Sequence, residues 1–269
     1  MGNVSVNVMP QPHRSEPLPG APPRAHLVEL YDGDGSSLAR NVGQYLFDGL
    51  HRGEGLLVIA GHEHTAAFRA ELDRLGADSA AAERDQRLVV LGAHETLARF
   101  MIGDRPDPEL FRATVTAAMR TVRRAGGGLR AYGEMVGILW QAGNTQAAVA
   151  LEDHWNRMVA ETEVDLYCAY PIDVFGSDFH AAVVDEILCA HTQLVPSGGT
   201  DLVRAIDRAM GDVLGSRADG LRPLMKANHR PAWGEVPPGE AVILWLRNNL
   251  PDYADEIVGR ARRYCRAYA

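Results

Sequence analysis

The sequence predicts an α/β protein in which a mostly parallel sheet is covered by helices on both faces, followed by an all-α C-terminal extension. Short apolar runs alternate with helix-length amphipathic segments from residue 26 to residue 170, as in successive strand–helix–strand units. The run at residues 55–60 (GLLVIA) is apolar almost throughout, as expected for a strand buried on both faces. Beyond residue 199, only helix-length patterns follow.

The elements follow in a regular order. The first strand is predicted at residues 26–31 (HLVELY), where β-branched and aromatic side chains alternate with polar ones. Asp107 before Pro108 is a typical helix start, a capping residue followed by a first-turn proline. Further strands are predicted at 55–60, 87–91, 129–132 and 164–170, and helices at 38–50, 63–75, 94–101, 108–124, 135–141 and 146–161.

The first strand is followed by a glycine loop, DGDGSS at residues 32–37, and a helix. This is the layout of a phosphate-binding loop, but that motif needs a lysine after its glycines to reach the phosphates. The chain holds one lysine, Lys226, far from this loop. Backbone amides at the helix start could still hold an anion, but the favoured interpretation is a helix capped by Ser36 or Ser37.

Composition shifts divide the chain into three parts. Residues 1–24 hold six prolines and no hydrophobic periodicity, which predicts a disordered lead. The α/β domain is expected at 25–196 and the helical extension at 200–269, after a Pro-Ser-Gly-Gly boundary. In the extension, the apolar run 243–246 predicts a docking face for a second copy, as a homodimer, or for another protein, and the final helix ends in an arginine cluster.

Composition also limits the function. A formal net charge of -8 argues against direct nucleic-acid binding as the main activity. The three cysteines are widely spaced without a CxxC pair, so no disulfide framework, structural metal or cofactor is predicted, and the expected compartment is the cytoplasm. No stretch has the length and apolarity of a membrane span or a signal peptide.

Residues 128–171 form the segment around which the remaining elements are predicted to pack. In α/β sheets, ligands bind where strands end and helices begin, and this segment contains two such ends. It therefore provides candidate ligand-binding residues for one pocket: Arg130, Glu134, Trp140, Trp155, Cys168 and Tyr170.

Each candidate also has a structural interpretation. Arg130 and Glu134 could form an ion pair, the tryptophans suit core positions on apolar helix faces, and Cys168 suits a buried strand position. The HEH triplet at residues 62–64 has no spaced third ligand and is a weak metal signal. No catalytic residue and no metal ligand is predicted.

Several of these segments carry a resemblance to a known family. In chain order they are HLVELY at 26–31, GLxxGE at 49–54, Arg130 followed by GEM at 133–135, LEDHW at 151–155, LYCAYP at 166–171 and ILCAH at 187–191. Their order and spacing over residues 26–196 are similar to those of the MEDS domain, a sensory domain named from methanogen and methylotroph regulators, including the dichloromethane-responsive repressor.

The resemblance implies a degenerate RecA/KaiC-like fold that lost its P-loop, with Leu38 and Ala39 where an ATPase would have Lys and Thr. It also implies the sensing of a small, hydrocarbon-like or one-carbon-related molecule. The residues that it adds or supports are His26, Arg130, Glu134, Trp155, Cys168 and His191.

The leading hypothesis is therefore a non-catalytic cytoplasmic sensor that binds an unidentified small molecule and signals through its helical tail to a protein partner. One alternative is a ligand-free interaction scaffold. The other is an enzyme, either a nucleotide hydrolase with an unusual loop or a metal-dependent hydrolase that uses His62 and His64.

Overall fold

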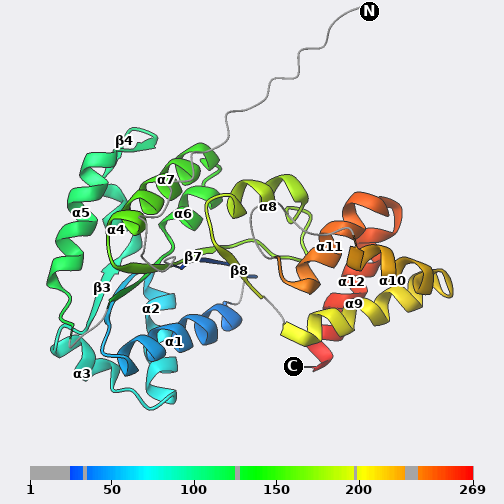
Figure 1. Ribbon diagram of the computed structural model, residues 1–269, viewed down its shortest axis with the longest axis horizontal. Helices are drawn as coiled ribbons and strands as arrows, with labels where there is room; N and C mark the ends of the chain where they lie inside the picture. Colours follow the sequence, from blue (N-terminus) through cyan, green and yellow to red (C-terminus); the bar gives the residue numbers. More distant parts are fainter. Residues whose placement is uncertain (1–24, 33–34, 125–127, 197–198, 228–235, 269) are drawn as a thin grey trace, which may run out of the picture.

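The computed structural model describes residues 25–32, 35–124, 128–196, 199–227 and 236–268 (Figure 1). The predicted disordered lead at residues 1–24 lies outside the described residues. No helix in the described ranges is both long and apolar enough to cross a membrane.

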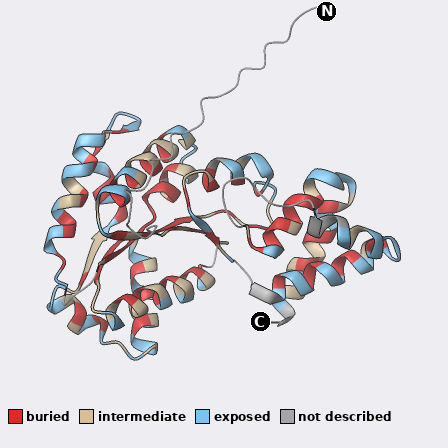
Figure 2. Ribbon diagram, viewed as in Figure 1, coloured by how far each residue is buried: buried red, intermediate tan, exposed pale blue. Residues whose placement is uncertain are grey.

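Six parallel strands form the main sheet, in the order β3-β2-β6-β7-β1-β8. The buried centre of the sheet is visible in Figure 2. The prediction of an α/β fold with a parallel sheet is confirmed. The strands are β1 (His26–Leu30), β2 (Gly55–Ala60), β3 (Leu88–Gly92), β6 (Leu129–Gly133), β7 (Val164–Tyr170) and β8 (Gln193–Val195).

Helices cover both faces of this sheet, as predicted (Figure 1). One face packs against α1 (Ser36–His51), α2 (His62–Arg74) and α3 (Ser79–Arg84). The other face packs against α4 (Ala93–Ala98), α5 (Pro108–Thr121), α6 (Met135–Gln141), α7 (Thr145–Glu161) and α8 (Ala181–Leu188). Because side chains alternate along a strand, Leu166, Cys168 and Tyr170 of β7 point to the α7 face, and Tyr167 and Ala169 to the α1 face.

The start of α1 differs from the prediction. The helix begins at Ser36, and the N-cap position is taken by Gly35, whose φ of 60° is left-handed and for which no side-chain capping bond is found. The predicted serine cap is therefore wrong, because both serines lie inside the first turn. A glycine suits this position since it adopts positive φ without a steric penalty. The predicted Asp107 cap is confirmed, as its carboxylate accepts bonds from the amides of Glu109 and Leu110 at 3.0 and 2.9 Å.

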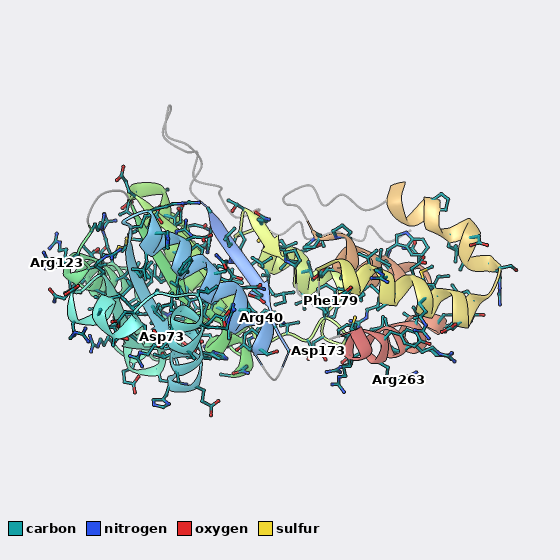
Figure 3. All side chains as sticks on the ribbon, turned by 90° about the horizontal axis from the view of Figure 1, so that it is seen from below. Arg40, Asp73, Arg123, Asp173, Phe179 and Arg263 are labelled. Atoms are coloured by element: carbon teal, nitrogen blue, oxygen red, sulfur yellow. The ribbon has the colours of Figure 1, made fainter. Side chains whose placement is uncertain are left out.

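The C-terminal part is helical, as predicted, with α9 (Gly199–Leu214), α10 (Arg217–Ala227), α11 (Pro238–Asn249) and α12 (Pro251–Tyr268). Helices α9, α11 and α12 pack against one another. They meet the sheet domain at the segment that follows β7, where Figure 3 shows Asp173 and Phe179 between the two parts. Arg247 of α11 donates hydrogen bonds to the carbonyls of Phe175 and Phe179, and Arg262 of α12 pairs with Asp173 at 2.9 Å.

The elements predicted above do not include α8 or four shorter ones: α3, β8 and the antiparallel pair β4 (Met101–Ile102) and β5 (Arg105–Pro106). Strands of two or three residues are too short to show a periodicity of two. The pairing of β8 with β1 arises only in the folded chain, where Leu27 to Glu29 lie beside Gln193 to Val195.

Candidate functional site

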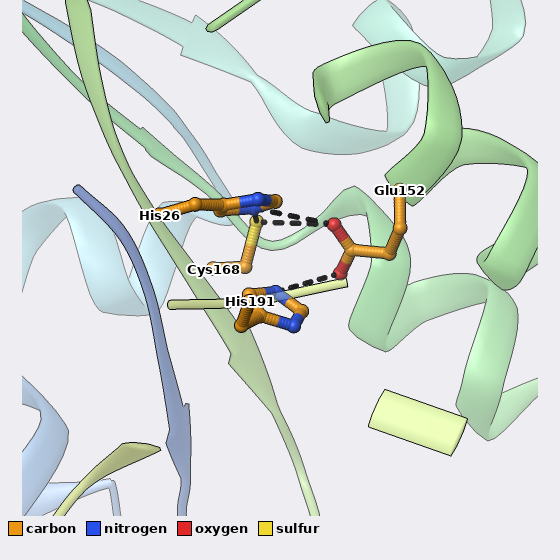
Figure 4. A group of neighbouring side chains, drawn as sticks. All are labelled: His26, Glu152, Cys168 and His191. Carbon is orange, nitrogen blue, oxygen red and sulfur yellow. Dashed lines mark hydrogen bonds and ion pairs between the residues drawn. The ribbon is translucent and has the colours of Figure 1, made fainter. Parts of the chain in front are cut away.

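Four chemically active side chains meet in the layer between the sheet and α7 (Figure 4). They are His26, Glu152, Cys168 and His191, which we call the four-residue cluster. Each of these residues is between 0% and 3% exposed, and their donor atoms all lie within 4.8 Å of one another. Such groups are rarely buried together in an apolar layer unless they bind one another or a ligand.

The pairing of β1 with β7 and with the chain around β8 brings His26, Cys168 and His191 together. Cys168 lies beside Val28 in the parallel pairing of β1 with β7, so His26, two residues before Val28, points to the same face. The Nε2 atom of His26 is 3.4 Å from Cys168 Sγ. His191 is held close by Thr192, whose amide donates to the His26 carbonyl at 2.8 Å and whose hydroxyl accepts from the His26 amide at 3.0 Å.

Glu152 comes from the buried face of α7. It shares this face with Ala148, Leu151, Trp155 and Val159, which follow the three- and four-residue spacing of an apolar helix stripe. Its Oε2 atom lies 3.4 Å from His26 Nε2 and 3.7 Å from Cys168 Sγ. Its Oε1 atom accepts a hydrogen bond from the Tyr170 hydroxyl at 2.7 Å. A carboxylate on the apolar stripe was the signal that could have identified this residue, which sequence reasoning missed.

The other nitrogen of each imidazole is fixed from outside the cluster. His191 Nδ1 is 2.6 Å from the Ile187 carbonyl, which can only accept, so Nδ1 carries the proton. His26 Nδ1 is 2.8 Å from the side-chain oxygen of Asn156 and donates in the same way. Each neutral ring therefore presents an unprotonated Nε2 atom to the cluster.

The electrostatics of the cluster follow from this arrangement. Burial lowers the pKa of His26, and the neighbouring His191 ring lowers it further. Burial alone would raise the pKa of Glu152, but charge and hydrogen bonding from protonated His191 and His26 would hold that pKa below its usual range. With both rings in the neutral form described above, that compensation is absent. The Nε2 atom of His191 lies 3.2 Å from Glu152 Oε1 but in a direction that makes no hydrogen bond, and among the described residues it has no hydrogen-bond partner.

Residue types alone would allow two chemistries at this site. Cys168, His26 and Asn156 have the composition of a Cys–His–Asn nucleophilic site. However, Cys168 is fully buried, and burial together with Glu152 raises the pKa of its thiol well above the ordinary value. A nucleophilic cysteine needs the opposite, an accessible thiol with a lowered pKa. The arrangement therefore favours ligand binding over nucleophilic attack.

The predicted single pocket is not formed by all of its candidates. Arg130 points to the α1 face of the sheet, opposite Cys168, and its Nε atom donates to Glu54 at 2.5 Å. Its guanidinium also lies over the Tyr45 ring, 4.7 Å from the ring centre. The partner of Arg130 is thus Glu54 and not Glu134, and this part of the predicted set is a buried ion pair.

Glu134 belongs to a third location, at the carboxyl ends of β2 and β6. It accepts hydrogen bonds from the Gly61 amide, from His64 Nδ1 at 2.6 Å and from the Tyr132 hydroxyl at 3.2 Å. The bond to Glu134 raises the pKa of His64 against the effect of burial. Glu134 thereby stabilises the N-terminal end of α2, where Gly61 is the N-cap.

The tryptophans divide between the core and the cluster. Trp155 is 1% exposed and packs edge-to-face on Phe111 at 5.1 Å, which is the core role that its apolar helix face indicated. Trp140 packs edge-to-face on Tyr170 at 5.7 Å. Of the eight candidates, the structure therefore brings His26, Cys168, His191 and Tyr170 together, with Trp140 against Tyr170. Their role in ligand binding stays a prediction.

A comparison with known families gives one relevant match. The family model described as MEDS, the MEthanogen/methylotroph, DcmR Sensory domain, matches residues 25–192. The match runs from the residue before β1 to Thr192, just before β8, and includes all four residues of the cluster. Comparison with curated proteins gives no match.

Proposed function

The chain belongs to the MEDS family of sensory domains, and we propose that it is a non-catalytic cytoplasmic sensor that receives its signal at the four-residue cluster. In this proposal, the binding of a small molecule changes the cluster, and the C-terminal helices pass that change to a protein partner. The supporting observation is the position of the cluster, which lies against the strand that leads directly into the contact with those helices.

The connection can be followed residue by residue. Glu152 accepts a hydrogen bond from Tyr170, the last residue of β7. The chain then continues through residues 171–180, where Arg247 binds two backbone carbonyls and Arg262 pairs with Asp173. A movement of Glu152 would therefore act on a segment that both α11 and α12 hold.

Two features support a non-catalytic role. The glycine loop before α1 has no lysine for a nucleotide phosphate, and the buried Cys168 has the raised pKa of an unreactive thiol.

Hydrogen exchange followed by mass spectrometry tests the connection. We expect Glu152→Gln to increase exchange at residues 171–180 and in α11 by about fivefold or more, because the Tyr170 hydroxyl loses its charged acceptor. A hydrogen bond to a charged group contributes about 1 kcal/mol more than one to a neutral group. The control is Glu83→Gln, which removes a partly exposed ion pair with Arg69. Exchange that changes only in α7 and the adjoining strands would contradict the proposed signalling route.

Native mass spectrometry of the protein purified from its own cytosol tests ligand binding. We expect an organic molecule of defined mass on the wild-type chain and its loss from Glu152→Gln. The control is again Glu83→Gln, which should carry the same molecule as wild type. If neither wild type nor Glu83→Gln carries such a molecule, the ligand-free scaffold is favoured instead.

A further inference from the structure

We propose that the four-residue cluster binds a transition-metal ion of the Zn²⁺ class, with His26, Glu152, Cys168 and His191 as its four ligands. The inference rests on the proposed function for the role of the cluster in sensing. Its metal binding is argued from geometry and charge alone.

The spacing of the donor atoms suits tetrahedral zinc. With Zn–N and Zn–O bonds of about 2.0–2.2 Å and Zn–S bonds of about 2.3 Å, neighbouring ligand atoms should lie about 3.3–3.7 Å apart. The distances from His26 Nε2 to Cys168 Sγ and to Glu152 Oε2 are both 3.4 Å. Cys168 Sγ is 3.7 Å from the same Oε2 atom, so these three atoms fit one face of the tetrahedron. His191 Nε2 lies 3.2 Å from the other carboxylate oxygen, Oε1. Because all four side chains offer donor atoms within 4.8 Å of one another, a small shift of His191 completes the set.

The hydrogen bonds outside the cluster are those that metal-bound histidines need. Ligating imidazoles usually donate their second N–H to a carbonyl or carboxylate, which fixes the tautomer and turns the other nitrogen toward the metal. The Ile187 carbonyl does this for His191, and the Asn156 side-chain oxygen does it for His26.

Without an ion, the same arrangement is unfavourable. Within the part of the chain that the structure describes, the lone pair on His191 Nε2 has no hydrogen-bond partner. It lies 3.2 Å from a carboxylate oxygen of Glu152, and both side chains are almost fully buried. An unpartnered buried polar atom destabilises the fold by about 1–3 kcal/mol. A cation between these atoms would bind both lone pairs at once.

The charges also balance. Two neutral imidazoles, one thiolate and one carboxylate carry two negative charges, which a divalent ion cancels, so the complex is neutral as its burial requires. Imidazole and thiolate donors favour Zn²⁺ and its transition-metal neighbours over Mg²⁺ and Ca²⁺. Because the thiolate and not the thiol is the metal ligand, metal binding at Cys168 releases the thiol proton.

Metal content of the full-length chain, expressed without a histidine tag in zinc-supplemented medium, tests this directly. By elemental mass spectrometry we expect about one Zn²⁺ per wild-type chain and at least about tenfold less in Cys168→Ser and His191→Gln. Cys189→Ser is the matched thiol control, since Cys189 is partly buried and is not among the four cluster residues, and it should keep its zinc.

Cobalt substitution detects the thiolate ligand in the folded wild-type chain, so this arm of the test does not depend on how well the variants fold. Wild type and Cys189→Ser reloaded with Co²⁺ should show a thiolate-to-cobalt charge-transfer band, and Cys168→Ser should not. A folded wild-type chain that holds no transition metal as purified and gives no such band after reloading would overturn the inference. So would a band that survives Cys168→Ser and disappears in Cys189→Ser.

Asn156 provides a test of the outer hydrogen bond. We expect Asn156→Ala to weaken Zn²⁺ affinity by about 10–100-fold, and Asn156→Asp, which keeps the acceptor, to restore it. Equal affinity in all three chains would contradict the positioning role and the assigned tautomer. The two proposals can fail separately. If the chain binds zinc but Glu152→Gln does not alter exchange in α11, the cluster is a structural metal site. If Glu152→Gln alters exchange but the chain binds no zinc, the chain is a metal-free sensor.

Discussion

A second buried carboxyl, Glu29, lies on the α1 face of the sheet, away from the four-residue cluster. Its two oxygens accept hydrogen bonds from the Tyr167 hydroxyl at 2.5 Å and from the Asn41 side chain at 2.9 Å. Burial nevertheless raises the pKa of Glu29 from 4.5 to about 7, with the two hydrogen bonds opposing that change. The folded chain therefore keeps this proton at pH values where the unfolded chain has lost it.

This difference gives a pH dependence of known sign. Between pH 4.5 and about 7, the unfolded chain binds fewer protons than the folded one, so the Glu29 contribution to the free energy of unfolding falls as pH rises and is constant above that range. We predict that the unfolding free energy of wild type, relative to Glu29→Gln, falls by about 2–3 kcal/mol from about pH 5 to about pH 8. Urea unfolding at several pH values measures it.

The matched control is Glu109→Gln, because Glu109 is exposed on α5. It measures the effect of removing an exposed carboxyl from the same chain, and this effect is subtracted from that of Glu29→Gln. Parallel curves for Glu29→Gln and wild type would show that the Glu29 carboxyl titrates equally in both states, contrary to its burial.

The four-residue cluster shows which site residues could be identified from the sequence and which could not. The family resemblance named His26, Cys168 and His191, and the strand end at β7 named Tyr170. The sequence could not place them together, because His26 and His191 are 165 positions apart and meet only through the β1–β8 pairing and the Thr192 hydrogen bonds. Glu152 was missed because it was treated only as one residue of the predicted helix 146–161 and not as a candidate for the site.

At the scale of elements, α6 approaches the end of β7 through a glycine. A Cβ atom on Gly137 would lie 2.8 Å from the Ala169 carbonyl oxygen and 3.0 Å from Pro171 Cδ. We predict that Gly137→Ala lowers the free energy of unfolding by about 1–3 kcal/mol, since backbone and proline atoms cannot move aside as a flexible side chain can. Urea midpoints at unchanged m value would measure the loss.

Gly211 in the interior of α9 is the comparison. Apart from its chain neighbours and the backbone of its own helix, no atom of the described residues lies within 4 Å of the position that its Cβ would take, and the residue is exposed. Gly211→Ala should therefore stabilise the chain by about 0.5–1 kcal/mol, the usual helix preference for alanine. If Gly137→Ala and Gly211→Ala both raised the free energy of unfolding, α6 would have room to shift away from β7, contrary to the prediction.

Most elements could be predicted from the sequence because their signals are local. The apolar run of β2, the Asp107–Pro108 start of α5 and the amphipathic pattern of α7 each lie within one short window. The order of the strands in the sheet could not be predicted in this way, because adjacent strands such as β1 and β7 are distant in the chain. The RecA/KaiC-like relationship stays an expectation from the resemblance.

At the scale of the whole molecule, the predicted division at residues 196 and 200 can be tested against the hydrophobic core. Residues on both sides, including Ile172 and Phe179 after β7 and Ile243 and Leu246 of α11, belong to one buried cluster. A continuous core favours cooperative unfolding. The polar contacts between the two parts described above are the bonds of Arg247 and Arg262 to residues 173–179.

We therefore predict that α7 and α12 unfold at the same urea concentration in wild type and at different concentrations in Arg247→Met. Methionine keeps an apolar stem but leaves the carbonyls of Phe175 and Phe179 without their donors, which weakens the contact by about 1–3 kcal/mol. Pulse-labelling hydrogen exchange along a urea series reports both helices in one sample. Arg263→Met is the control, because Arg263 is exposed on α12 (Figure 3) and should leave the midpoints together. Separate midpoints already in wild type would instead establish two independently folding domains. The signalling route through residues 171–180 would then act across a weak contact between them, which ligand binding could release.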